Sequence, residues 1–194
     1  MNNVKAIAGD SVQAAVIRPT AGFEQVHAGG VFHILCYDKD GELKWEEKGP
    51  NLVVNTGLQY MVSTSLDAAA QITPWYIGLI STLTTIAGGD TMITHTGWAE
   101  DTNYSQATRP TAQFGTATTL NPSELSNSVA SGGTVAVFTI NGTTTVNGAF
   151  LTSDNTKGGS TGTLFSAKAF TGGARAVISG DTLNVTYTFS LTGT

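Results

Sequence analysis

Acidic residues occur in two stretches of this chain at spacings that can support metal binding or acid–base chemistry. In the first, residues 36–47, the positions of Asp38, Asp40 and Gly41 match those of a calcium-binding loop, but the first ligand would be Cys36. Calcium prefers hard oxygen ligands, and such loops join helices, whereas the flanking residues here alternate at period two, as in strands. The stretch therefore predicts a β-hairpin that turns at Asp38 to Gly41, with no metal site.

The second stretch lies within residues 82–110, where His95 stands between Asp90 and Asp101 in the sequence. A histidine with two carboxylates can hold a metal or transfer protons, but these residue types are also ordinary in polar loops. Glycoside hydrolases use a pair of carboxylates, yet the neighbours Glu100 and Asp101 would point to opposite faces of an extended chain. We therefore expect no catalytic residue, no cofactor, no metal and no enzymatic activity.

Arg109 is the one basic residue between Lys48 and Lys157. An isolated arginine at the end of a loop often clamps carboxylates or backbone carbonyls, so we predict a structural or interface ion pair.

The single cysteine, Cys36, lies in an apolar strand pattern that predicts a buried and inert thiol. The chain also lacks a G-x-S-x-G nucleophile motif and the lysine and helix that complete a phosphate-binding loop.

The composition narrows the function classes further. The net charge is −5 and the basic residues are scattered, which argues against nucleic-acid binding. No run of about 18 apolar residues is present, and the first residues lack the pattern of a secretory signal, so we expect a soluble protein that does not enter a membrane. Charged residues make up only 12% of the chain, about half the usual share, and a surface of low charge suits contacts between subunits.

Several segments carry signals for strands and turns. Apolar and polar residues alternate without error over 182–191, which predicts a strand with one buried face. The Asn-Gly pair at 141–142 favours a two-residue turn and predicts a tight hairpin between 135–140 and 143–151. Residues 154–162 have the composition of a flexible, exposed loop.

One short helix is predicted around residues 56–66, with Asn55 or Thr56 as its cap. Its apolar residues recur at helical spacing, namely Leu58, Met61, Val62 and Leu66.

These elements predict a mainly β protein with the fold of an antiparallel β-sandwich, of which the jelly roll is one form. Residues 29–194 are expected to form a single domain, and residues 1–28 an extended arm or an edge strand. The long connection 82–110 is expected to be packed down by apolar residues and to lie at an interface. The candidate interface residues are Val12, Ile17, Arg18, Met92, His95, Trp98, Tyr104 and Arg109.

A set of motifs covers most of the chain from about residue 29. In order, they are ILCYDKDGELKWEEKGPNLVVNTGLQYM, WYIGLI, DTMITHTGWAEDTNYSQATRP, GTLFSAKAF and GDTLNVTYTFSL. As an ordered set, they resemble a family of small virion proteins of tailed double-stranded DNA bacteriophages. Residues 1–28 lie outside this resemblance, and no catalytic or receptor-binding residue is carried over from it.

The resemblance implies a structural protein of the virion without enzymatic activity. It would be a capsid decoration or cement subunit that binds the major capsid protein on the outer surface of the head. Copies of the chain would associate, as a homotrimer by analogy with other viral β proteins. The alternative is a head or tail fibre module that recognises a bacterial surface glycan, with Trp98 and Tyr104 exposed to stack on sugars.

Overall fold

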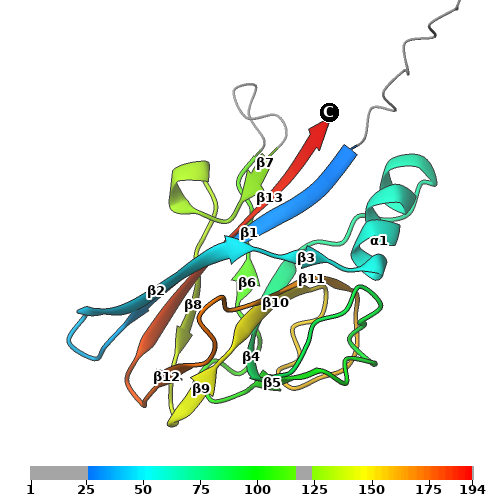
Figure 1. Cartoon of the computed structure of the whole chain (residues 1–194). Helices are drawn as coiled ribbons and strands as arrows, with labels where there is room; N and C mark the ends of the chain where they lie inside the picture. The colour runs from blue at the N-terminus through cyan, green and yellow to red at the C-terminus, as the bar shows by residue number, and fades with distance from the viewer. Residues whose placement is uncertain (1–25, 117–123, 194) are drawn as a thin grey trace, which may run out of the picture.

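The computed structural model describes residues 26–116 and 124–193. Two large antiparallel sheets pack face to face, and a short two-stranded sheet completes one end (Figure 1). The expected mainly β, antiparallel sandwich with one α-helix is therefore confirmed. No helix in the described residues is long and apolar enough to cross a membrane.

The first sheet has the order β2–β1–β13, and β7 and β8 share the other edge of β13. Its strands are β1 (Val26–Tyr37), β2 (Leu43–Pro50), β7 (Glu124–Ser126), β8 (Ala136–Thr139) and β13 (Thr182–Gly193). The alternating segment 182–191 thus lies in a central strand, as its pattern predicts. Strand β1 starts three residues before the expected domain boundary, because residues 26–28 pair with residues 191–193.

The second sheet has the order β3–β11–β10–β4–β5, with β6 on the same edge of β4 as β5. Its strands are β3 (Leu52–Val53), β4 (Trp75–Leu83), β5 (Trp98–Asp101), β6 (Thr111–Ala112), β10 (Gly148–Thr152) and β11 (Leu164–Ala169). The short sheet pairs β9 (Thr144–Val146) with β12 (Arg175–Val177). Helix α1 (Asn55–Leu66) follows β3, and the 3-10 helix η1 (Val129–Ser131) follows β7.

The first predicted hairpin is confirmed as β1–β2. The Asp38 side chain accepts hydrogen bonds from the backbone N–H groups of Asp40 and Glu42, both at 2.9 Å. Gly41 takes the positive-φ position of the turn, at +86°. Cys36 is buried within β1, where desolvation raises the pKa of its thiol to about 12. The carboxylate and glycine of this loop therefore shape a turn, which is the structural role that the flanking strand pattern predicts.

The second predicted hairpin, around the Asn-Gly pair at 141–142, is wrong. Strand β8, before this pair, pairs with β13, and strand β9, after it, pairs with β12. Between them, Ile140 exchanges backbone hydrogen bonds with Asp181 and Gly180, at 2.8 and 2.9 Å. These long-range partners replace the local ladder that a two-residue turn would form.

The second sheet is covered on both faces. Its inner face packs against the first sheet, where residues such as Ile34, Leu79 and Val185 are buried. On its outer face, Phe150 and Ile80 form a second cluster with residues from the connection after β4 and from β5. A sheet buried on two sides explains why β10 has no exposed residue along its length.

Candidate functional site

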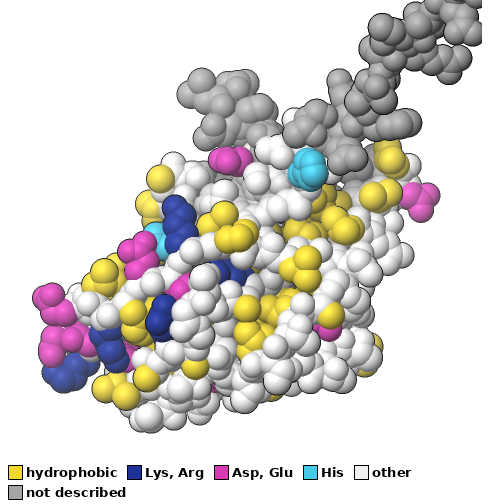
Figure 2. Space-filling model, in the orientation of Figure 1, with side chains coloured by type: hydrophobic (Ala, Val, Ile, Leu, Met, Phe, Trp, Pro, Cys, Tyr) yellow, Lys and Arg dark blue, Asp and Glu magenta, His cyan; other side chains and the backbone are white. Residues whose placement is uncertain are grey.

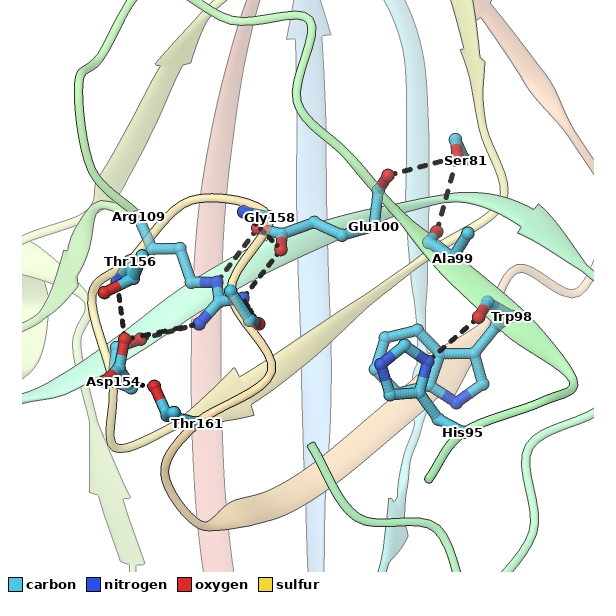
Figure 3. A network of polar contacts seen from close by, with 11 residues as sticks. Ser81, His95, Trp98, Ala99, Glu100, Arg109, Asp154, Thr156, Gly158 and Thr161 are labelled. Carbon is cyan, nitrogen blue, oxygen red and sulfur yellow. Dashed lines mark hydrogen bonds and ion pairs between the residues drawn. The ribbon is translucent and has the colours of Figure 1, made fainter. Parts of the chain in front are cut away.

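Arg109, the isolated arginine of the sequence, is fully buried at the edge of the second sheet. Its guanidinium donates to both carboxylate oxygens of Glu100, from Nε at 2.9 Å and from Nη2 at 2.7 Å (Figure 3). It also donates to the backbone carbonyls of Asp154 and Gly159, at 2.9 and 2.7 Å, and lies 5.2 Å from the ring centre of Phe150. The predicted structural ion pair is thus confirmed, and we call this group the Arg109 cluster.

The Arg109 cluster fixes the loop that follows β10. Besides the two carbonyls, the backbone N–H of Gly158 donates to Glu100 at 2.9 Å. The Asp154 carboxylate accepts from the backbone N–H of Thr156 and the hydroxyl of Thr161, and these hydrogen bonds, led by that of Thr156, hold the pKa of Asp154 below its usual value. Residues 154–162 form an exposed loop, as predicted, since none of them is buried. The loop is not free, however, because its backbone at Gly158 and Gly159 is hydrogen-bonded to Glu100 and Arg109.

The residues considered for acid–base chemistry are engaged in local structure. His95 stacks on the Trp98 indole at 3.9 Å between ring centres, and its Nδ1 lies 2.9 Å from the Trp98 carbonyl oxygen. Asp90 accepts from the Trp98 indole N–H at 3.0 Å, whereas Asp101 accepts from the backbone and side chain of Asn103. Within residues 26–116 and 124–193, no group of three or more His, Cys, Asp or Glu side chains could hold a metal ion.

The doublet Glu100–Asp101 does not form a carboxylate pair for hydrolysis. Both oxygens of Glu100 are held by Arg109, and Asp101 is buried and bonded to Asn103. Each carboxylate therefore serves a different local network, on its own side of β5.

A second buried ion pair joins the two sheets. Lys168 on β11 donates to Glu47 on β2 at 3.1 Å, and the backbone N–H of Thr171 donates to the same carboxylate at 2.9 Å. Burial acts to raise the pKa of Glu47, but the hydrogen bonds from Thr171 and Lys168 outweigh it, so that the pKa lies below its ordinary value. Glu47, the last residue of the stretch 36–47 that was compared with a calcium-binding loop, is thus the partner of a buried lysine.

Four of the proposed interface residues are buried in the chain itself, which contradicts a contact role for their side chains. Met92, Trp98, Tyr104 and Arg109 are each at most 5% exposed. The connection is packed down by its apolar residues, as expected, and this packing removes them from the surface. His95 is half-buried against Trp98. The other three, Val12, Ile17 and Arg18, lie outside the described residues.

The described chain does have an open apolar region, which is lined by residues of α1, β7, β11 and β13, among others. Figure 1 shows where these elements lie in the sandwich. A cavity of about 350 Å³ opens there, and none of its lining residues is charged. Aromatic rings meet edge to face along its wall, with centre distances of 5.2 Å for Tyr60–Trp75 and 5.3 Å for Phe165–Phe189. We call it the terminal pocket; its rim includes Tyr60, Met61, Phe114, Leu125 and Phe189.

Helix α1 separates the terminal pocket from a second apolar surface. Tyr60 and Met61 face the pocket, whereas Leu58, Val62 and Leu66 lie on another face and are 41%, 59% and 85% exposed. Figure 2 shows hydrophobic side chains over this helix, while charged side chains gather at the opposite end, around the β1–β2 turn. We call Leu58, Val62 and Leu66 the helix stripe. Their four-residue spacing places them on one side of the helix.

The sequence offered a partial signal for this region. The spacing of apolar residues correctly predicted α1, but it did not show that most of them point away from the core. The terminal pocket had no local signal, because its lining residues come from distant segments of the chain. Searches with this chain found no matching family model, no matching curated protein and no matching solved structure.

Proposed function

We propose that this chain is a non-enzymatic structural protein of a tailed-phage virion, of the capsid decoration or cement type. It binds the major capsid protein on the outer surface of the head, together with other copies of itself. The ordered motifs described above motivate the choice of particle. The physical support is a surface suited to protein contact rather than to chemistry, which lies at one end of the molecule.

The observation that carries this proposal is the exposed helix stripe. Leu66 is 85% exposed and Val62 59% exposed on a helix that contains no charged residue. Single exposed apolar residues are ordinary, but an aligned row beside an apolar cavity is typical of a protein-binding surface. Uncharged residues are also favoured at the centre of an interface, because a charged group buried there would lose its hydration. We therefore assign the capsid contact to the helix stripe and its surroundings.

The connection after β4, which was the earlier candidate for this contact, contributes less. Its large side chains are used to cover the outer face of the second sheet. The glycan-binding alternative relied on Trp98 and Tyr104 as exposed stacking platforms, and both are buried. No second function is therefore proposed.

The test is a binding experiment with phage heads that have been stripped of accessory proteins. Purified protein is mixed with the heads, the mixture is sedimented, and the number of bound copies per head is measured. We expect saturable binding at hundreds of copies in a lattice-binding role. Binding of only a few copies, or of none, would contradict the decoration role.

Matched variants locate the contact. Leu66→Asp should abolish binding and leave the circular dichroism spectrum unchanged, because the side chain points into solvent. Ile93→Asp is the control, since Ile93 is similarly exposed at 77% but belongs to the connection and not to α1. Loss of binding with Ile93→Asp and not with Leu66→Asp would move the contact to the connection.

A further inference from the structure

The terminal pocket lies close to the point where the described chain begins. Phe189, on its rim, pairs with Gly30 of β1 on one side and with Leu125 of β7 on the other. Val26, the first described residue, is four positions further along β1 and pairs with Gly193. Twenty-five residues precede Val26, so a long segment is tethered about 13 Å from an open apolar cavity.

That segment contains a run that matches the chemistry of the pocket. Between Asp10 and Arg18 the sequence is SVQAAVI, which has no charged residue and includes Val12, Val16 and Ile17. The pocket likewise has no charged lining residue, and its wall consists mainly of aromatic and aliphatic side chains. Burying two or three aliphatic side chains there would remove apolar surface from water, which favours the contact.

The direction of β1 indicates which copy supplies the run. Going from Gly30 to Val26, the chain moves away from Phe189 and hence away from the pocket. A chain would have to reverse within residues 18–25 to reach its own pocket. In an assembly of symmetry-related copies, the segment of one copy can instead reach the pocket of a neighbouring copy without such a reversal.

We propose that the run Val12–Ile17 of one copy occupies the terminal pocket of a second copy, so that subunits are linked by exchange of their N-terminal segments. Eight residues, 18–25, separate the run from β1 and can span about 27 Å when extended. The exchange uses a surface different from the helix stripe, because Tyr60 and Met61 of α1 line the pocket while Leu66 points elsewhere. A subunit can therefore bind its copies and a capsid at the same time.

Disulfide trapping on the full-length chain tests this exchange. Variants with one introduced cysteine, Val12→Cys, Val16→Cys and Ile17→Cys, carry one tag; each is mixed with Leu125→Cys, which carries another, and oxidised. Leu125 is suitable because it lines the pocket and is 38% exposed. The native Cys36 does not compete, since it is buried. We expect a disulfide between differently tagged chains for at least one of the three, on non-reducing gels.

Each other outcome of the trapping experiment overturns the exchange. The double variant Val16→Cys/Leu125→Cys is oxidised at high dilution, and a disulfide within one chain would show that the segment returns to its own pocket. No disulfide with Leu125→Cys in any variant would show that the run does not occupy the pocket. Val137→Cys, 40% exposed on β8 outside the pocket, is the matched control for random collision and should remain unlinked.

A second measurement does not depend on cysteine chemistry. Molar mass from light scattering should fall to that of a single chain for Leu125→Asp and for a variant lacking residues 1–20, and should be unchanged for Val137→Asp. An unchanged mass for both of the first two variants would overturn the exchange. These measurements need only the purified chain, so their result is independent of whether the protein binds a phage head.

Discussion

The Arg109 cluster and the terminal pocket differ in their side chains and in their access to solvent. The cluster contains the arginine and carboxylates that could have performed chemistry, and it is sealed: Arg109 is 1% exposed and its donors are taken up by Glu100 and two carbonyls. The pocket contains no charged lining residue, yet it is open. The Arg109 cluster therefore has a structural role although its residue types could perform chemistry, and the terminal pocket is suited to binding because it is accessible.

The physical reason is the cost of burying charge. An arginine taken out of water must be paired and hydrogen-bonded, and the Arg109 cluster meets this need with groups from β5 and from the loop after β10. Those bonds hold the loop in place and engage both oxygens of the Glu100 carboxylate. An apolar surface has no such requirement, so it remains available to a partner.

The largest expected effect comes from breaking the Arg109 cluster. Arg109→Ala should lower the free energy of unfolding by about 3–5 kcal/mol, because Glu100 would be left buried without its partner. Denaturant unfolding measures this, and hydrogen exchange should show lost protection over residues 153–163. Lys39→Ala, which removes an exposed ion pair with Asp40, is the control and should change little. Equal effects for the two variants would show that burial does not distinguish the cluster.

A smaller effect is expected from the packing beneath Arg109. Gly78 lies under the Phe150 ring, and a Cβ atom at position 78 would come within 2.1 Å of that ring. Gly78→Ala should therefore destabilise the fold by about 1–3 kcal/mol through overpacking. Gly29→Ala is the matched control in β1, since a Cβ atom there meets no other atom within 4 Å. Thermal unfolding of the two variants should separate them clearly, and the same midpoint in both would contradict the tight packing.

Acid should loosen the cluster before it affects the terminal pocket. The pKa of Asp154 is lower in the folded chain than its ordinary value of 3.8, so its contribution to stability is present above about pH 4 and is lost as the pH falls through the folded pKa. We expect protection of the loop 153–163 from hydrogen exchange to decrease on acidification in the native chain. Asp154→Asn should show a weaker dependence on pH, and an identical dependence in both would exclude Asp154 as its origin.

The smallest effect on stability is expected at the helix stripe. Leu66→Ser should change the free energy of unfolding by no more than about 0.5 kcal/mol, because the side chain is already in solvent. Leu79→Ser, at a fully buried position on β4, provides the contrast and should unfold the protein or destabilise it strongly. A large loss of stability for Leu66→Ser in the isolated chain would mean that the stripe is covered by another part of it or by a second copy.

Local patterns in the sequence were sufficient for the elements whose conformation depends on neighbouring residues. The alternation over 182–191 predicted β13, the carboxylate and glycine at Asp38 and Gly41 predicted the β1–β2 turn, and helical spacing predicted α1. The isolated position of Arg109 also predicted its structural ion pair. Each of these signals reflects interactions within a few residues or a simple balance of charge.

Only the tertiary structure decided what distant segments do to one another. The Asn-Gly pair at 141–142 has the local chemistry of a hairpin, but pairing of β8 with β13 overrides it. The loop 154–162 has a flexible composition, but a buried arginine from elsewhere in the chain anchors it. Helical spacing placed Leu66 on one side of α1, but the position of the sheets determined that this side faces solvent. Burial is a property of the packed molecule, and it decides which residues remain free to bind.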